Sequence, residues 1–403
     1  FNQMKAYIHK LYDEILCKEQ SNDIIISGAS SLKVIILIVS KLLNQILITI
    51  TSIFKENPDI SSKTVCIVLT QNQMRSVSPL VDDSIAVIRP RLDSANISNS
   101  RIFYFPALVY FWDFIFQVSY IIKRSNTSWK QIYNAAAYYY YYKSFKRYFS
   151  KNRPKSVVIT NPSHPILRSS VLAAHDLKIP TVYLPHASAS PLYPTIKTDY
   201  ALLEGTDALH LYRFADFTKK ILLGSPRLDP YIKMKRIEHQ GINILVAANL
   251  LDDIEKVYEL FCLLKNNDST KHCRFLFRPH PNLSVDCDKF AKLGIEVISP
   301  KQESCLESLE RTDVLISANS TIFFEAIYLP IRCYYYDFVK DGLVKDSYNL
   351  KSYKFVNYLS IDVKIDTTPF YIDKEEADRI DINMQSKQVS SDLIVKFLNN
   401  TIQ

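Results

Sequence analysis

Glycine is scarce in this sequence, with six among 403 residues. Glycine-rich phosphate loops need several glycines at short fixed spacings, so a GxGxxG dinucleotide fingerprint and a Walker-type loop are excluded. Cysteines are scattered: the seven stand at positions 17, 66, 262, 273, 287, 305 and 333 without a CxxC pair. An odd, dispersed set in apolar surroundings favours reduced, buried thiols and a cytoplasmic protein.

The sequence also lacks an uninterrupted apolar segment of membrane-spanning length. Residues 33–54 are rich in Ile and Leu, but Lys41 and Asn44 interrupt them, which favours a buried helix. Residues 101–124 and 138–151 combine aromatic with basic side chains. Either they form core helices of a first domain, or they hold a peripheral protein at the inner face of the cytoplasmic membrane.

The charge balance is mildly basic: 49 Lys and Arg against 41 Asp and Glu give a net charge of +8. No zinc-finger, homeodomain or RNA-binding signature accompanies this excess, so we expect no nucleic-acid partner. The excess suits phosphorylated substrates, an anionic membrane surface, or simply a solvated lysine-rich surface. Asp82-Asp83 and Asp252-Asp253 are plain acidic pairs rather than a DxD motif, and we expect no metal site.

Short β-branched runs alternate with helical stretches along most of the chain, which indicates βαβ units and parallel sheets. We predict strands near residues 23–27, 64–69, 84–88, 156–160, 181–185, 199–203, 221–223, 243–247, 274–277, 295–298, 313–316 and 332–336. A Pro-flanked, charged connection follows residue 224 and places a domain boundary near residue 235. The expected units are residues 1–235, with aromatic and basic helices at about 101–150, residues 236–385, and a C-terminal helix in 386–403 that crosses back to the first domain.

The strongest local motif is Arg278-Pro279-His280-Pro281, directly after a predicted strand. Ligands of open α/β sheets bind outside the carboxyl ends of strands, so a cation and an imidazole fixed beside two prolines suit a phosphate. The alternative is a structural turn with a capping histidine.

A second motif lies about 40 residues later, where a predicted strand runs through Asn319, Ser320 and Thr321 into a helix. Hydroxyls and backbone N–H groups at a helix start face an anion, although an ordinary N-cap would explain Ser320 or Thr321 alone. Glu325 follows one turn later, where its carboxylate reaches ribose hydroxyls or caps the helix.

Polar residues also follow three predicted strands of the first half. His186 comes after Leu184-Pro185, and Glu204 ends the strand before Gly205. Either side chain could accept a proton in catalysis, although a lone histidine at a strand end is more often structural. Asn161 and His164 follow another strand and are candidates for the acceptor side of the site.

The order of these motifs resembles the GT-B superfamily of bacterial capsule and wall-polymer transferases, which includes polysialyltransferases, capsular Kdo transferases and CDP-glycerol glycerophosphotransferases. The resemblance covers residues 155–340 and implies two Rossmann-like domains whose parallel sheets face each other across a central cleft. It implies that His280, Ser320 and Thr321 hold the nucleotide phosphate of a donor. His186-Ala187 matches the family's His-Gly motif with Ala for Gly, and Leu203-Glu204-Gly205 matches its acidic-acidic-Gly motif with Leu in the first acidic position.

The resemblance therefore predicts a metal-independent glycosyltransferase that needs no separate cofactor. Its donor is expected to be CMP- or CDP-linked, such as a CMP-linked nonulosonic acid or Kdo, as in a sialyltransferase-like enzyme. Its acceptor is a bacterial surface glycan or glycolipid of the capsule or lipopolysaccharide. Three alternatives stay open: a CDP-glycerol-type polyol-phosphate transferase, a UDP-sugar 2-epimerase-like enzyme, and a non-catalytic scaffold for glycan assembly.

Overall fold

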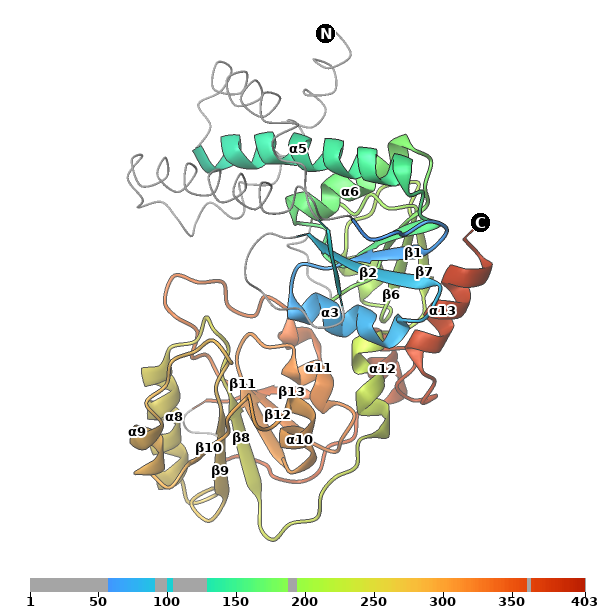
Figure 1. Ribbon diagram of the computed structural model, residues 1–403. Helices are drawn as coiled ribbons and strands as arrows, with labels where there is room; N and C mark the ends of the chain where they lie inside the picture. The colour runs from blue at the N-terminus through green and yellow to red at the C-terminus, as the bar shows by residue number, and fades with distance from the viewer. Residues whose placement is uncertain (1–56, 91–99, 104–128, 188–193, 361–363, 403) are drawn as a thin grey trace.

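Two parallel β-sheets form the two halves of the molecule in this computed structural model (Figure 1). The structure describes residues 57–90, 100–103, 129–187, 194–360 and 364–402. The predicted strand at 23–27, the apolar stretch at 33–54 and most of the aromatic segment at 101–124 lie outside these residues.

The first sheet has seven strands in the order β3-β2-β1-β4-β5-β6-β7. They are β1 (Thr64–Ile67), β2 (Ile85–Pro90), β3 (Arg101–Phe103), β4 (Ser156–Ile159), β5 (Thr181–Tyr183), β6 (Tyr200–Leu203) and β7 (Lys219–Leu222). The central strands are buried along their whole length and are apolar after a first hydroxyl residue, as expected for a parallel sheet covered on both faces. Val65 of β1 lies in register with Val157 of β4, where the direction of winding reverses.

The second sheet has six strands in the order β10-β9-β8-β11-β12-β13. They are β8 (Asn243–Ala247), β9 (Arg274–Arg278), β10 (Glu296–Val297), β11 (Val314–Ser317), β12 (Arg332–Tyr335) and β13 (Val356–Tyr358). Its winding reverses between β8 and β11. The carboxyl edges at such reversal points are where open α/β sheets bind ligands.

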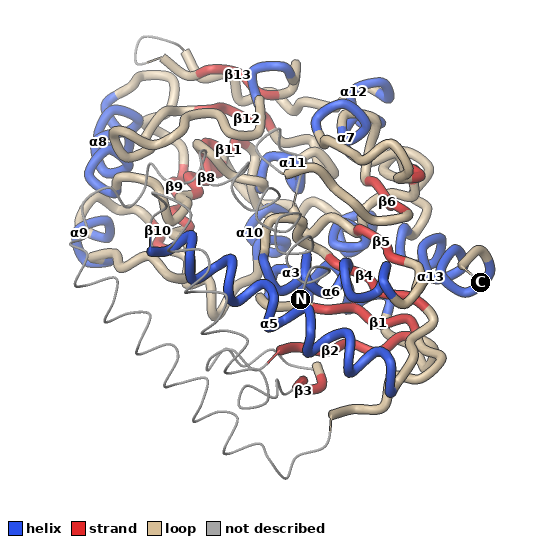
Figure 2. The backbone as a smooth tube through the Cα atoms, turned by 90° about the horizontal axis from the view of Figure 1, so that it is seen from above, coloured by secondary structure: helices blue, strands red, loops and turns tan. Residues whose placement is uncertain are grey.

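Helices cover the faces of both sheets (Figures 1 and 2). The α-helices are α3 (Gln71–Val77), α5 (Trp129–Lys151), α6 (Pro165–Asp176), α7 (Ala208–Leu211), α8 (Ile254–Asn266), α9 (Cys287–Ala291), α10 (Cys305–Glu310), α11 (Ile322–Ala326), α12 (Lys374–Ile380) and α13 (Ser390–Asn400). Short 3-10 helices are η2 (Ser78–Leu80), η4 (Pro226–Lys233) and η5 (Leu350–Ser352). Local capping explains several starts: Asp253 caps α8, and Ser304 with Glu307 forms a capping box on α10.

The tyrosine-rich segment after residue 138 belongs to α5 and faces the protein interior. Tyr138, Tyr142, Phe145 and Phe149 are buried in the same core as α6. Among the two alternatives drawn from the sequence, the structure therefore supports a core helix for this segment, because buried rings cannot enter a bilayer. No helix of the described residues is both long and apolar enough to cross a membrane.

The prediction of helix from residue 101 onward was wrong at its start. Residues 101–103 form β3, which pairs with Ile88–Pro90 of β2. Dense aromatic content fits a strand as well as a helix, and a three-residue edge strand carries no periodicity to separate them.

The chain crosses between the two halves twice. The first crossing is the segment through η4, since β7 ends at Leu222 and β8 begins at Asn243. The second runs back through α12 to α13, whose Ile394 and Leu398 are buried against the first sheet (Figures 1 and 2). Ring contact between Phe397 and Tyr200 of β6 joins α13 to that sheet.

Two glycines make the second crossing sterically feasible. A Cβ on Gly205 would collide with the carbonyl oxygen of Arg379, and one on Gly224 would collide with Asn383 and Ser390. Gly224 also has φ of 82°, a conformation that glycine adopts without strain.

Candidate active site

His186 lies at the carboxyl edge of the first sheet, three residues after β5. Its Nδ1 is 2.5 Å from the carbonyl oxygen of Thr160, which follows the neighbouring strand β4. A carbonyl oxygen only accepts, so Nδ1 carries the proton and Nε2 keeps a lone pair in the neutral ring. Burial lowers the pKa of His186, which favours this neutral form.

Glu204 lies on the same edge, directly after β6, which pairs with β5, and is only 7% exposed. The Tyr212 hydroxyl donates to its Oε1 at 3.3 Å, whereas Oε2 has no hydrogen-bond partner among the described residues. Burial raises the pKa of Glu204, whereas the charge of Arg227 and the Tyr212 hydrogen bond lower it. Burial is the largest of these effects, and the resulting pKa is about 7. The carboxyl group can therefore exchange a proton near neutral pH.

Asn161 and His164, predicted on the acceptor side, form the turn between β4 and α6. Asn161 Oδ1 accepts from the Ser163 amide at 2.8 Å. His164 Nδ1 accepts from the Ile166 amide at 3.3 Å and so caps α6, and burial lowers the pKa of His164 to about 4. Both side chains thus have local structural partners, and contact with an acceptor stays a prediction.

Arg227 of η4 connects the carboxyl edge of the first sheet to the second domain. Its Nη1 lies 3.3 Å from Glu325 Oε1, and the Tyr231 hydroxyl donates to Glu325 Oε2 at 2.8 Å. Arg227 also lowers the pKa values of His186 and Glu204 by its positive charge. Both oxygens of Glu325 therefore hold the connecting segment. The contact of Glu325 with a ribose stays a prediction.

Sequence reasoning missed Arg227 as a site residue. The segment Ser225-Pro226-Arg227 marked a domain boundary and formed part of the motif order behind the family resemblance, but no site role was assigned to the arginine. The sequence feature that could have identified Arg227 is its place beside a proline at the domain boundary. A cation at that place can reach both sheets.

Loops at the carboxyl edge of the second sheet come together around β8. His280 follows β9, Asn249 follows β8, and Ser320 follows β11, three neighbouring strands. Asn249 Nδ2 donates to the Asn319 carbonyl oxygen at 2.5 Å, which joins two of these loops. His280 and Ser320 therefore lie on the same edge, on either side of β8.

The half-buried imidazole of His280 has a defined hydrogen-bonding state. Its Nδ1 accepts from the Asn282 amide at 3.2 Å, so in the neutral ring Nε2 carries the proton. Burial lowers the pKa of His280 and favours that neutral form. Pro281, directly after it, limits the backbone freedom of this turn.

Asn319 uses its side chain to fix the loop that follows β12. Its Nδ2 donates to the Val344 carbonyl oxygen at 2.5 Å, and its Oδ1 accepts from the Ser347 amide at 2.9 Å. Ser320 Oγ accepts from the Ile322 amide at 3.3 Å. Thr321 occupies the N-cap position of α11 without a side-chain capping bond, so the hydroxyl cap expected there comes from Ser320 instead.

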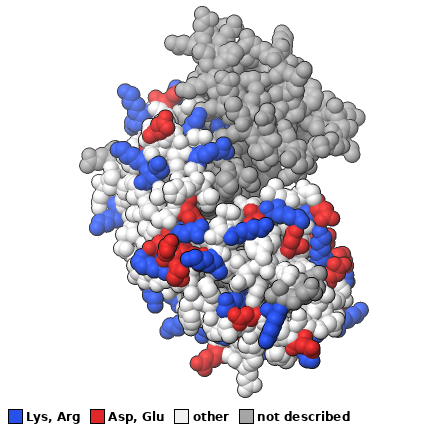
Figure 3. All heavy atoms as spheres, turned by 180° about the vertical axis from the view of Figure 1, so that it is seen from behind, with Lys and Arg blue, Asp and Glu red and all other residues white. Residues whose placement is uncertain are grey.

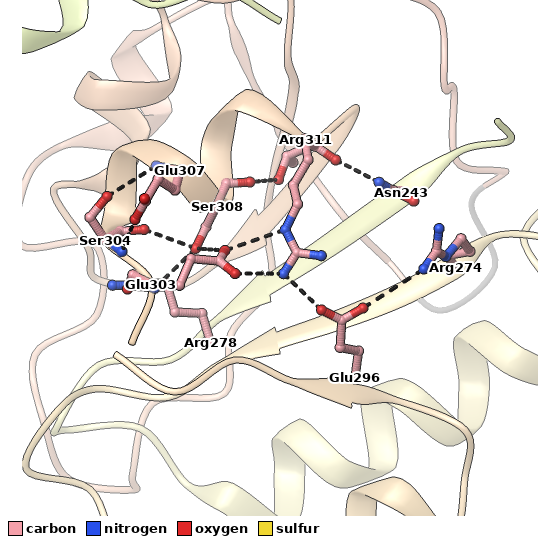
Figure 4. A network of polar contacts seen from close by, with 10 residues as sticks. Asn243, Arg274, Arg278, Glu296, Glu303, Ser304, Glu307, Ser308 and Arg311 are labelled. Carbon is pink, nitrogen blue, oxygen red and sulfur yellow. Dashed lines mark hydrogen bonds and ion pairs between the residues drawn. The ribbon is translucent and has the colours of Figure 1, made fainter. Parts of the chain in front are cut away.

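Arg278 points toward the start of α10 (Figure 4). Its Nη1 donates to the Glu303 carbonyl oxygen and to Ser308 Oγ, both at 3.0 Å. Glu303 in turn pairs with Arg311 at 2.9 Å. The guanidinium therefore positions α10, which sequence reasoning had not anticipated.

Charges of both signs are mixed on one face of the molecule. On the face seen from behind, Lys and Arg side chains are interspersed with Asp and Glu (Figure 3). Within the described part of the chain, no three His, Cys, Asp or Glu side chains gather into a group that could hold a metal ion.

Comparisons with known proteins give a structural likeness without a sequence family. No family model matches the sequence, and no curated protein matches it. The glycotransferase of kitacinnamycin superposes with a TM-score of 0.51 at 10% identity, covering 85% of this chain and 100% of that one.

Two further solved structures are less similar. UDP-GlcNAc 2-epimerase from Methanocaldococcus jannaschii gives a TM-score of 0.49 at 11% identity, covering 84% of this chain and 99% of that one. The wall teichoic acid polymerase TagF gives 0.42 at 11% identity, covering 92% and 97%. The two parallel sheets and the likeness to the kitacinnamycin glycotransferase establish that the chain has the GT-B fold, with two Rossmann-like domains.

Proposed function

We propose that the chain is a glycosyltransferase that moves a sugar from a nucleotide donor onto a bacterial surface glycan. The observation that carries the proposal is Glu204: a buried carboxyl group with one unpartnered oxygen, at the carboxyl edge that faces the second domain. A pKa of about 7 suits a general base, because such a group is partly ionised at working pH and still binds a proton well.

In the proposed reaction, Glu204 or His186 takes the proton of an acceptor hydroxyl. The hydroxyl oxygen attacks the anomeric carbon of the donor sugar, and the bond from that carbon to the phosphate oxygen breaks. The electron pair leaves with the nucleotide, so negative charge develops on its phosphate. Preorganised donors that meet this charge contribute a large share of the rate enhancement of such reactions.

The leaving phosphate is proposed to bind at the carboxyl edge of the second sheet, in contact with the Nε2–H of His280 and the Ser320 and Thr321 loop. The convergence of these loops around β8 supports that placement. Arg278 acts here as a positioning residue, because its guanidinium fixes α10 beside the His280 turn. The proposed donor is CMP- or CDP-linked.

The test is product release from a panel of CMP-, CDP-, UDP- and GDP-linked donors in the presence of capsule or lipopolysaccharide acceptors. Release of a nucleoside monophosphate identifies a CMP-sugar or CDP-alditol, and release of a diphosphate identifies a UDP- or GDP-sugar. Glu204→Gln should lower kcat by roughly 100-fold or more, the usual contribution of a general base.

Glu376→Gln is the matched control, because Glu376 of α12 is also a buried glutamate with a raised pKa. Its carboxylate differs from that of Glu204 in accepting a hydrogen bond from the Lys354 amide. It should retain the parent's kcat. A Glu204→Gln variant as active as the parent would exclude Glu204 as the base. The proposal itself fails if the parent releases no nucleotide from any donor.

A further inference from the structure

We propose that a hollow at the amino edge of the first sheet binds one unit of an acidic glycan, apart from the site of transfer. The hollow has a volume of about 510 Å³, within the roughly 300–1,000 Å³ range of small-molecule sites. Its principal lining side chains come from the end of α6 and the starts of β6 and β7: His175, Lys178, Asp199, Tyr200, Phe217 and Lys219.

The hollow is separate from the proposed reaction edge. Tyr200 begins β6 and Glu204 follows its end, so the two sites are a strand length apart, about 13 Å at 3.3 Å per residue. The choice of a glycan as ligand rests on the proposed function, but the side chains of the hollow carry the argument for its acidic character.

Asp199 supplies an oriented acceptor for sugar hydroxyls. Its Oδ2 accepts from the amide and the hydroxyl of Thr181, both at 2.8 Å, whereas Oδ1 accepts no hydrogen bond within the described part of the chain. The side chain is 41% exposed toward the hollow. Burial raises the pKa of Asp199, but hydrogen bonds from His175 and Thr181 outweigh burial and lower it to about 2, so the carboxylate stays ionised.

A hydrolytic role for this cluster is excluded by its geometry. His175 Nε2 lies 2.9 Å from Thr181 Oγ1, which superficially matches a nucleophile and base. The Thr181 hydroxyl donates its proton to Asp199 rather than to His175, so His175 does not act as its base.

Two ammonium groups border the hollow without a carboxylate partner among the described residues. Lys219 Nζ lies 5.6 Å from the centre of the Tyr200 ring. Lys178 has φ of 53° in the turn after α6, a position that favours glycine or asparagine. Arg153 Nη2 donates to the Lys178 carbonyl oxygen at 3.2 Å and so holds this turn in place.

Phe217 supplies an apolar face beside these charges. It is 55% exposed, and its ring meets the edge of His175 with centroids 6.0 Å apart. An exposed aromatic ring can cover the C–H face of a sugar. A neutral sugar would leave the lysines unused, and inorganic phosphate would leave Asp199 and Phe217 unused. A carboxylated sugar offers its carboxylate to the lysines, its hydroxyls to Asp199 and its C–H face to Phe217.

The test is isothermal titration of the full chain with pentasaccharides of N-acetylneuraminic acid and of galacturonic acid. Phe217→Ala and Lys219→Ala should each weaken binding of the better probe at least tenfold. Lys220→Ala is the matched control, because Lys220 is the next residue of β7 and its Nζ lies over Phe214, 5.5 Å from the ring centre. It should bind like the parent.

The proposal is overturned if neither acidic probe binds, if Phe217→Ala and Lys219→Ala bind like the parent, or if maltopentaose or CMP competes for the same site. If the probe binds as expected while no donor is turned over, the proposed function fails and the acidic-glycan site stands. If donors are turned over but no acidic probe binds at the hollow, only the present inference fails.

Discussion

Replacing Glu204 with glutamine should make the stability of the protein less dependent on pH. The pKa of Glu204 is raised from 4.5, the ordinary value, to about 7 in the folded state. The folded protein therefore holds this proton more tightly than the unfolded chain does. The side chain contributes its full stability below pH 4.5, and that contribution falls as pH rises through 7.

The size of the effect follows from the shift. A difference of 7 − 4.5 is 2.5 pKa units, and at 1.36 kcal/mol per unit it corresponds to about 3 kcal/mol. Because Glu204 is almost completely buried, solvent screening does not reduce this figure much. Glutamine keeps the shape of the neutral acid and can accept from Tyr212, but it does not ionise.

The measurement is urea unfolding of the parent and of Glu204→Gln between pH 4 and pH 9. The free energy of unfolding of the variant, minus that of the parent, should rise by about 3 kcal/mol over this range, most steeply between pH 4.5 and 7. Asp252, whose pKa is also raised to about 7 by burial, titrates in both proteins and cancels in the difference. A difference that is flat, or that falls with pH, would refute the assignment of Glu204 as a buried acid.

Two further predictions concern the second crossing and the donor edge. Gly224→Ala should lower the free energy of unfolding by about 2–4 kcal/mol, because the new Cβ collides with Asn383 and the backbone is left-handed. Gly241 also has a positive φ, but a Cβ there meets nothing within 4 Å, so Gly241→Ala should lower it by only about 1 kcal/mol. Equal losses in urea unfolding would show that the collision is relieved without cost. His280→Ala should abolish the rise in Tm produced by cytidine or uridine nucleotides, whereas His272→Ala, at the opposite end of β9, should preserve it. Undiminished stabilisation of the His280 variant would contradict the donor-site assignment.

Much of the fold could be predicted from the sequence because parallel strands are buried on both faces and read as short apolar runs. The prediction of two parallel α/β sheets is confirmed, and the expected strand at 243–247 coincides with β8. Two strands were missed, β3 and β13. Each has three residues, and Asn357 in the middle of β13 interrupts the apolar pattern.

The candidate site was less predictable, because the sequence identifies polar residues at strand ends but not their partners. Arg278 contacts Glu303, 25 positions away, and Arg227 contacts Glu325, 98 positions away. Only the fold shows that these charges are already engaged. The burial that shifts the pKa of Glu204 likewise depends on packing between distant segments.

The two crossings between the domains are bonded to each other. Asn383 Nδ2 donates to the Leu223 carbonyl oxygen at 2.7 Å, and the Ser390 amide donates to Asp229 Oδ1 at 2.8 Å. Domain closure usually relies on a few residues that absorb backbone rotation. Here two segments cross between the domains and are hydrogen-bonded to each other, so the backbone of one cannot rotate independently of the other. Relative motion of the two domains at this point would therefore have to break these hydrogen bonds or move both segments together.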